Sequence, residues 1–295
     1  MRIATLIKDR TSPFLSMEFF PPAEESHLPE FFATVDRLRE ASPLFVSVTY
    51  GAGGGKQRNT LKVTAELARR GLTVMAHLTC VGANGEDIEN FLVQLEQAGV
   101  DNVLALRGDM PVGRQWDPAR GAFAHASDLV LHLRKVRPEL GIAVAAYPAP
   151  HPESPSYAAD REFTLLKLRQ GADFAITQLF FDVREYMDLV DGLRAKGMTL
   201  PVIPGILPIQ SFDTLRRVLS MCGANIPGKL YLQMEEADRK GGAEAVREAG
   251  KAFALEQMRR LLDIGAPGIH LYTLNKSELC LQIAREAGLA PSPGA

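Results

Sequence analysis

Short apolar runs alternate with longer segments of helical periodicity along the whole chain. Apolar, β-branched and aromatic runs bounded by glycine, proline or polar residues predict strands. Eight strands are predicted, at residues 15–20, 44–50, 73–79, 102–106, 142–147, 173–180, 201–204 and 268–272. Because these runs are mostly apolar on both faces, they are typical of parallel strands covered by helices.

Amphipathic segments after these strands predict helices, several of which stop at a glycine that favours the left-handed conformation. They cover residues 28–41, 59–70, 86–98, 127 to a point before Pro138, 158–170, 183–196, 211–221, 243–264 and 277–287. A polar stretch over 223–242 interrupts this alternation, and we expect it to form an excursion over one mouth of the fold. Residues 288–295 are predicted to be a loose tail.

Eight strand–helix units without a linker indicate a single catalytic domain over residues 1–295, with the fold of a (β/α)8 TIM barrel and an extra helical or loop excursion before strand eight. The main alternative is a doubly wound open sheet, which normally carries a glycine-rich phosphate-binding turn after its first strand. Here the first strand runs into Phe19-Phe20-Pro21-Pro22. This sequence favours the barrel.

Polar side chains stand at the carboxyl end of nearly every predicted strand, where the active sites of such barrels lie. This pattern predicts a catalytic or cofactor-binding mouth. The most unusual of these residues is Glu18, because a carboxylate in an apolar strand is costly unless it is paired or used. Two interpretations remain open from the residues alone: Glu18 is a structural carboxylate paired with an arginine inside the barrel, or it is a catalytic group.

The composition narrows the class of protein. Hydrophobic residues make up 46%, enough for a large core, and 33 Lys+Arg against 35 Asp+Glu give a net charge of −2. This balance argues against a nucleic-acid or polybasic membrane surface. Without a signal-peptide pattern or an apolar run of roughly 18 residues, a cytoplasmic protein is expected. Three scattered cysteines predict no disulfide framework, and His77 with Cys80 lacks the further ligands that a metal site needs.

Eight segments, in order, resemble the methylenetetrahydrofolate reductase family. They are MEFFPP (17–22), VTYGA (48–52), HLTC (77–80), LRGD (106–109), AAYP (145–148) with HPE (151–153), AITQ (175–178), PGILP (204–208) and YTLN (272–275). The resemblance covers the family's catalytic barrel and not the regulatory domain of eukaryotic relatives. It implies ping-pong reduction of 5,10-methylenetetrahydrofolate to 5-methyltetrahydrofolate by NADH or NADPH, with FAD bound tightly but non-covalently.

The resemblance also implies roles for individual residues. Glu18 would be the general acid that protonates a folate nitrogen, and its apolar surroundings predict a raised pKa. Asp109 would tune the flavin and stabilise the cationic iminium form of the substrate. The residues implied for FAD are Thr49, Tyr50, Ala52, His77, Arg107, Gly108, Asp109, Ala126, Tyr147, His151, Asp160 and Lys167. Those implied for the substrate are Gln178, Tyr272 and Lys276, although many relatives have arginine at the last position.

The expected partners are a small folate and further copies of the chain in a homo-oligomer, with no nucleic acid and no membrane. An alternative is that the same barrel works as a subunit of a complex and receives its electrons from a partner protein. A Schiff-base lyase barrel is disfavoured, because it needs a lysine on an inner strand face and no predicted strand has one.

Overall fold

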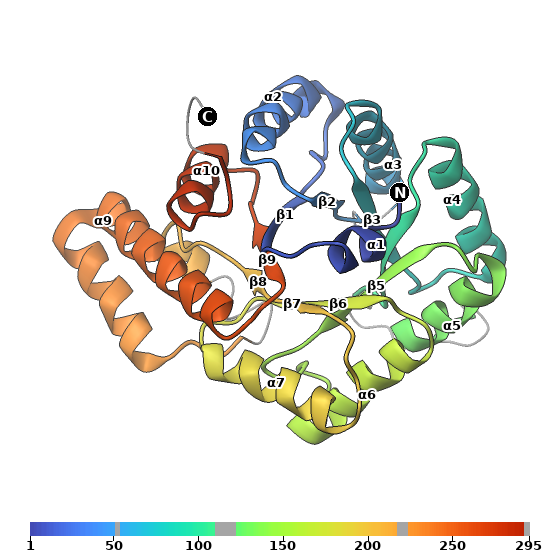
Figure 1. Ribbon diagram of the computed structural model, residues 1–295. Helices are drawn as coiled ribbons and strands as arrows, with labels where there is room; N and C mark the ends of the chain where they lie inside the picture. Colours follow the sequence, from blue (N-terminus) through green and yellow to red (C-terminus); the bar gives the residue numbers. More distant parts are fainter. Residues whose placement is uncertain (51–53, 110–121, 217–223, 292–295) are drawn as a thin grey trace.

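In the computed structural model, nine parallel strands alternate with helices and form one sheet, in the order β7-β6-β5-β4-β3-β2-β1-β9-β8 (Figure 1). The structure describes residues 1–50, 54–109, 122–216 and 224–291, with residues 54–58 described by their backbone only. The strands are β1 (Phe14–Phe19), β2 (Phe45–Val48), β3 (Val74–Thr79), β4 (Asn102–Leu106), β5 (Gly141–Ala146), β6 (Phe174–Thr177), β7 (Val202–Ile203), β8 (Gly205–Ile206) and β9 (Gly268–Tyr272).

The predicted (β/α)8 barrel is confirmed, and its seventh strand is split. Pro204 alone separates β7 from β8, and it interrupts the ladder because proline has no N–H to donate. The chain keeps its place in the sheet, since His270 N donates to Pro204 O at 2.9 Å and Gly205 N donates to Thr177 Oγ1 at 2.9 Å. The two ends of the strand order are thus joined through one residue, and the sheet closes.

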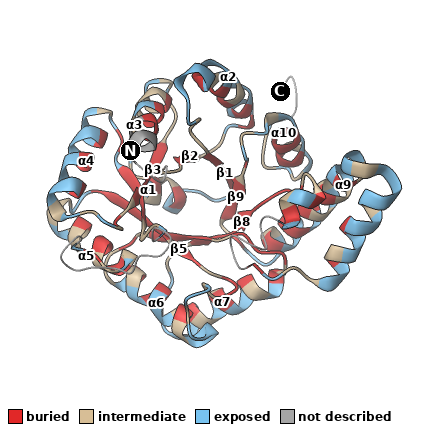
Figure 2. Ribbon diagram, turned by 180° about the vertical axis from the view of Figure 1, so that it is seen from behind, coloured by how far each residue is buried: buried red, intermediate tan, exposed pale blue. Residues whose placement is uncertain are grey.

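Helices surround the strands, with their buried side turned inward and their exposed side outward (Figure 2). They are α2 (Leu28–Leu38), α3 (Gly54–Arg69), α4 (Gly85–Gln97), α5 (Ala126–Val136), α6 (Tyr157–Arg169), α7 (Val183–Ala195), α9 (Gly228–Asp263) and α10 (Ser277–Glu286). Residues 212–216 are also helical. Most bounds lie within two residues of those predicted, but α3 begins at Gly54, five residues earlier than expected.

A short helix that the periodicity did not predict, α1 (Ile3–Lys8), closes the amino-terminal end of the barrel. It lies within the ring of strands in Figure 1. Ile3 and Ile7 pack in one cluster with Phe45 and Phe174 from inside the barrel, and Ile3 N donates to Asn102 Oδ1 at 2.8 Å. Six residues are too few for a clear helical period, so tertiary packing decides this element.

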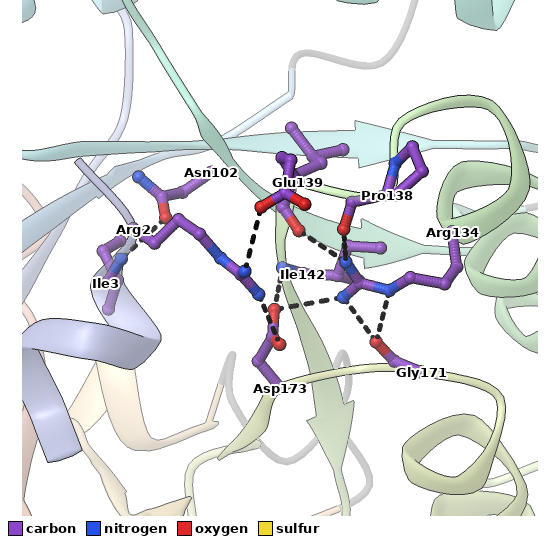
Figure 3. Close-up of polar contacts among 10 residues, drawn as sticks. Arg2, Ile3, Asn102, Arg134, Pro138, Glu139, Ile142, Gly171 and Asp173 are labelled. Carbon is purple, nitrogen blue, oxygen red and sulfur yellow. Dashed lines mark hydrogen bonds and ion pairs between the residues drawn. The ribbon is translucent and has the colours of Figure 1, made fainter.

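Charged contacts tie the start of the chain to the same end of the barrel (Figure 3). Asp173, just before β6, accepts from Arg2 at 3.0 Å, from Arg134 at 3.2 Å and from Ile142 N at 2.8 Å. Arg134 also donates through Nε to Gly171 O at 3.0 Å. These bonds serve the architecture, because they lie at the opposite end of the strands from the predicted mouth.

The excursion predicted over 223–242 is helical for most of its described length. It forms the first arm of α9, which bends back on itself at Gly241 (φ −151°, ψ 16°) and Gly242 (φ 60°, ψ −151°). Leu230 and Met234 of this arm pack in a separate apolar cluster with Leu207, after β8, and other residues following β6 and β8. The arm therefore lies beside the carboxyl ends of those strands.

The predicted loose tail begins later than expected. Leu289 N donates to Ala284 O at 3.0 Å, and Leu289 and Ala290 pack against the main core. Residues 292–295 lie outside the described part of the chain.

Candidate active site

Glu18 stands next to last in β1, and its side chain is buried with only 6% of the residue exposed. Its Oε2 lies 3.2 Å from His77 Nε2 on β3 and 3.7 Å from His270 Nε2 on β9. Ser47 Oγ on β2 donates to the same oxygen at 3.5 Å. Three neighbouring strands thus converge on one carboxylate, which has histidine partners and not the arginine considered in one interpretation.

These partners overturn the prediction of a raised pKa for Glu18. Burial works to raise the pKa, but the contacts with His270 and His77 outweigh it and lower the pKa to about 2. An isolated carboxyl in an apolar strand end would stay protonated, whereas this one lies beside two imidazoles. At neutral pH the Glu18 carboxyl is therefore ionised.

A hydrogen-bonded chain continues from Glu18 toward the interior of the barrel. Ser47 Oγ lies 3.4 Å from His270 Nε2, and Ser16 Oγ lies 2.8 Å from His270 Nδ1. Ser16, Ser47 and His270 are fully buried. Each hydroxyl can donate or accept, so the chain can hold a proton at more than one site.

His77 contacts Glu18 without a well-formed hydrogen bond. Its Nε2 is buried and, although 3.2 Å from Glu18 Oε2, has no partner of hydrogen-bond geometry within the described residues. The contact with Glu18 is thus electrostatic, and it contributes to the low pKa of that carboxyl. The cofactor role of His77 stays a prediction.

The turn after β9 holds the strand end that carries Glu18. Thr273 Oγ1 donates to Glu18 O at 2.7 Å, while Asn275 accepts from Phe20 N at 3.1 Å and donates to Phe20 O at 2.7 Å. Leu274 and Asn275 both have positive φ, at 45° and 57°. Such a pair of non-glycine residues is strained, and strain of this kind is typical of functional sites.

A cavity of about 330 Å³ opens beside the carboxyl ends of β4 and β5, between α5 and α6. It brings together six residues predicted to hold FAD: Arg107, Ala126, Tyr147, His151, Asp160 and Lys167. Arg107, Tyr147 and His151 were expected near this place from their strand ends, whereas Ala126, Asp160 and Lys167 were implied only by the family resemblance. Phe163 and Leu166 of α6 add apolar lining.

Two cations and their counter-charges give this cavity its electrostatics. Burial lowers the pKa of Lys167 to about 8, with the charge of Asp160 acting in the opposite direction. Lys167 Nζ donates to Ala145 O at 2.5 Å. Arg107 binds Glu153 through two hydrogen bonds of 2.5 and 2.8 Å, which raise the pKa of the guanidinium. Asp160 accepts from His151 N at 2.9 Å.

The lining of this cavity fits one end of a dinucleotide. A pyrophosphate is bound best by cationic donors, which Arg107 and Lys167 provide, and an aromatic base is bound by apolar and aromatic walls, which Tyr147 and Phe163 provide. Ser154 Oγ, also in the lining, is buried without a hydrogen-bond partner in the described part of the chain. The cationic side chains, the aromatic walls and the unpaired Ser154 hydroxyl are together consistent with FAD binding.

Other predicted cofactor residues lie outside this cavity. Thr49 O accepts from Thr60 Oγ1 at 3.1 Å, and the Tyr50 ring packs edge-on against Phe91 with centroids 5.7 Å apart. Gly108 has φ 85°, and a Cβ there would lie 2.9 Å from Val81 Cγ1, so glycine is required where two loops meet. Asp109 is exposed after β4. Ala52 lies outside the described residues.

The predicted substrate residues share the carboxyl end of the barrel but differ in surroundings. Gln178 Oε1 accepts from Leu179 N at 2.9 Å. Tyr272 pairs with Glu18 in the sheet register, and its hydroxyl donates to Thr177 O at 2.7 Å. Lys276 is exposed and precedes α10.

Sequence reasoning missed His270, Ser16 and Ser47 as parts of the Glu18 cluster. A signal was present: Gly268, His270 and Tyr272 alternate along one strand, as Ser16 and Glu18 do along another. A polar residue that faces inward two positions before the end of a strand lies one layer of side chains below the carboxyl end of the barrel. The sequence did not show which of these inward-facing residues on different strands lie next to one another in the barrel.

The chain was compared with known proteins. The family described as methylenetetrahydrofolate reductase matches residues 2–288. "Methylenetetrahydrofolate reductase (NADH) 1" of Arabidopsis thaliana is 36% identical over 98% of this chain and 51% of its own length. "5,10-methylenetetrahydrofolate reductase" of Escherichia coli is 34% identical over 94% of this chain and 91% of its own. The chain therefore spans about half the length of the plant relative and most of the bacterial one.

A solved structure shares the fold. It is a Clostridium thermocellum protein described as binding two copies of 5-methyl-5,6,7,8-tetrahydrofolic acid, with a TM-score of 0.67 and 15% identity. The match covers 96% of this chain and 98% of that one.

Within the described residues, no helix has the length and apolar character needed to cross a membrane. In the same residues, no group of His, Cys, Asp and Glu is arranged to hold a metal ion.

Proposed function

The chain belongs to the methylenetetrahydrofolate reductase family, and from that premise we propose that it reduces 5,10-methylenetetrahydrofolate to 5-methyltetrahydrofolate with electrons from NADH or NADPH. The observation that carries the proposal is the buried Glu18 carboxylate between His77 and His270 at the carboxyl ends of the strands. The reaction needs a proton donor shielded from water, and this buried cluster is proposed to act as one.

Glu18 is the proposed general acid, and the cluster around it supplies its proton. Opening the five-membered ring of the substrate requires a proton on a nitrogen, which releases the electrophilic methylene-iminium. With a pKa of about 2, Glu18 cannot store that proton by itself at neutral pH. Ser47 bridges Glu18 and His270, so this hydrogen-bonded chain is proposed to deliver a proton to the carboxylate as it is consumed.

Arg107, Tyr147, His151, Asp160 and Lys167 are the residues proposed to hold FAD. When bound, FAD supplies hydride transfer between the nicotinamide and the folate. The residues orient the cofactor: Lys167 and Arg107 neutralise phosphate charge, and the apolar side of α6 excludes water. His77, whose buried Nε2 lies 3.2 Å from Glu18 Oε2, is proposed to contact the cofactor or the folate beside Glu18.

Asp109 is proposed to act by charge. It is exposed after β4, two residues from Arg107, and a carboxylate there stabilises positive charge that develops on the folate. Gln178, Tyr272 and Lys276 are proposed to bind and orient the substrate.

The test of the proposed acid is Glu18→Gln, followed anaerobically through each half-reaction. We expect NADH to bleach the bound flavin at nearly the wild-type rate and folate to reoxidise it at least about 100-fold more slowly, because general acid catalysis typically contributes that much or more. Glu24→Gln, an exposed carboxylate, is the control and leaves both rates unchanged. Equal loss of the two half-reactions would make Glu18 structural.

The same experiment distinguishes the source of electrons. If NADH or NADPH alone bleaches the purified protein, no partner subunit is needed. Bleaching only after addition of a partner protein would support the alternative in which the barrel is a subunit of a larger complex. Light scattering of the purified chain tests the proposed homo-oligomer.

A further inference from the structure

A carboxylate lies in the proposed cofactor cavity and occupies one of its two cations. Glu153, in the loop after β5, lines the same cavity as Arg107, which follows β4. The two side chains join these loops through hydrogen bonds of 2.5 and 2.8 Å. Lys167, the other cation, donates instead to a neutral carbonyl, Ala145 O. The proposed function gives Glu153 no role.

The loop after β5 presents Glu153 to Arg107 through bonds of its own backbone. Glu153 N donates to His151 Nδ1 at 3.1 Å, and Ser154 N donates to His151 O at 2.7 Å. His151 N in turn donates at 2.9 Å to Asp160, in the first turn of α6. The carboxylate therefore stands on a folded turn that is anchored to a helix.

The ion pair uses the part of Arg107 that a phosphate would need. A guanidinium binds an anion best through two parallel hydrogen bonds along one edge. The edge formed by Nη1 and Nη2 of Arg107 holds Glu153, and Nε donates to Gly108 O at 3.3 Å. Each terminal nitrogen retains one N–H, and these two point apart. A phosphate therefore cannot form two parallel bonds to Arg107 while Glu153 stays.

Charge and exposure indicate which partner moves. The hydrogen bonds of the pair lower the pKa of Glu153 and raise that of Arg107, so both are charged at neutral pH. A phosphate that approached this pair would be repelled by the carboxylate. The Glu153 side chain is 60% exposed and that of Arg107 only 24%, so the carboxylate is the partner that can turn into water at little cost.

We propose that Glu153 is a displaceable stand-in for a phosphate of FAD. It holds Arg107 before the cofactor binds and leaves the guanidinium when the phosphate arrives, so it lowers the affinity for the cofactor by acting through Arg107. The exchange breaks two hydrogen bonds to a carboxylate and forms two to a phosphate, without transfer of a proton or an electron. This inference rests on the proposed function, in which Arg107 neutralises phosphate charge.

Glu153→Gln tests the stand-in, because it keeps the size of the side chain and removes its charge. After removal of FAD, we expect this variant to bind FAD about fivefold more tightly than the wild type in a fluorescence titration, the size of one partly exposed ion pair. Arg107→Gln is expected to bind FAD more weakly. Glu89→Gln, at an exposed position of α4, is the control and is expected to bind FAD like the wild type.

The double variant Arg107→Gln/Glu153→Gln separates competition for Arg107 from other effects. If Glu153 acts by occupying the guanidinium, its removal brings no gain where the guanidinium is absent, and the double variant binds FAD as weakly as Arg107→Gln alone. A gain that persists in the double variant would identify repulsion through space and overturn the stand-in role. Weaker FAD binding by Glu153→Gln than by the wild type would also overturn it, because Glu153 would then support Arg107.

Titration with ADP distinguishes a failure of this inference from a failure of the proposed function. ADP carries the pyrophosphate and adenosine of FAD without the flavin, and calorimetry is expected to show about fivefold tighter ADP binding to Glu153→Gln than to the wild type. If FAD does not bind to the wild type, the proposed cofactor is wrong, and ADP alone decides the role of Glu153. Equal ADP affinities of the two proteins, or no ADP binding to either, would overturn the stand-in role.

Discussion

Glu18 is ionised in a place where burial alone would protonate it, and the cause is the pair of histidines on β3 and β9. In its proposed role as general acid, a carboxyl with such a low pKa depends on its neighbours for its proton. The chemistry of this residue is therefore a property of Glu18, His77 and His270 together.

The pH dependence of stability tests this arrangement. Because the pKa of Glu18 is lowered from 4.5 to about 2 on folding, its stabilisation is present above pH 4.5 and is lost as pH falls through 2. We expect the difference in unfolding free energy between wild type and Glu18→Gln to shrink by about 3 kcal/mol over that interval. Urea unfolding at successive pH values measures it, and a difference independent of pH would contradict the low pKa.

Lys167 gives a second prediction, with the opposite sign. Burial lowers its pKa from 10.5 to about 8, so the side chain loses its charge as pH rises through 8. If Lys167 binds a phosphate, FAD affinity falls over the same range. Fluorescence titration from pH 6 to 9.5 should show this fall, and Lys167→Met should bind FAD more weakly at pH 7 without it. The exposed Lys135→Met is the control, and an unchanged pH profile in Lys167→Met would exclude the role.

Among the elements, α9 departs most from a regular barrel helix. Its two arms are joined at Gly241 and Gly242, where a helical backbone would have run straight on. The bend returns the chain so that its first arm covers the apolar residues after β6 and β8, while its outer face stays exposed (Figure 2). A polar cavity between α9, α10 and the end of α2 depends on this bend, because the second arm of α9 forms one wall of that cavity.

Gly242→Ala should therefore lower stability without any clash. No atom lies within 4 Å of a Cβ built at Gly242, so the cost comes from its φ of 60° with ψ of −151°, a region open almost only to glycine. We expect a loss of about 1–3 kcal/mol by urea unfolding. Gly228→Ala, at the exposed start of the same helix, should be neutral or slightly stabilising. Equal effects at the two glycines would show that the bend is not held by this residue.

At the scale of the whole molecule, the barrel is closed at one end and open at the other. Helix α1 and the ion pairs of Asp173 fill and fasten the amino-terminal end (Figure 3), whereas the cavities and the Glu18 cluster lie at the carboxyl end. The packed side chains at the amino-terminal end hold the strands in register. That register sets the distances between Glu18 and the histidines at the carboxyl end.

Ile3→Ala tests whether the α1 plug supports the whole barrel. Ile3 is fully buried, and its truncation should cost about 2–5 kcal/mol of unfolding free energy. Thr5→Ala, on the exposed side of the same helix, should cost much less. Loss of α1 structure without a change in global unfolding would contradict a supporting role.

Much of the fold follows from local pattern. Apolar runs of strand length and amphipathic segments alternate clearly enough to predict the barrel, and strands 102–106 and 268–272 agree residue for residue with the structure. Burial of strands by helices is a property of each segment's own residues, so it can be predicted without knowing the partners. The same holds for the polar strand ends, which marked Glu18, His77, Arg107, Tyr147 and His151.

Contacts between distant segments decided the rest. Ser16 and His270 are 254 positions apart and Ser47 and His270 are 223 apart, so no local pattern indicates that they meet around Glu18. The split at Pro204, the α1 plug and the two arms of α9 likewise depend on what lies next to them in space. The sequence by itself determined that the acidic residue Glu18 lies at the mouth of a barrel. The tertiary structure alone decided its charge, because a pKa depends on neighbours brought together by the closed sheet.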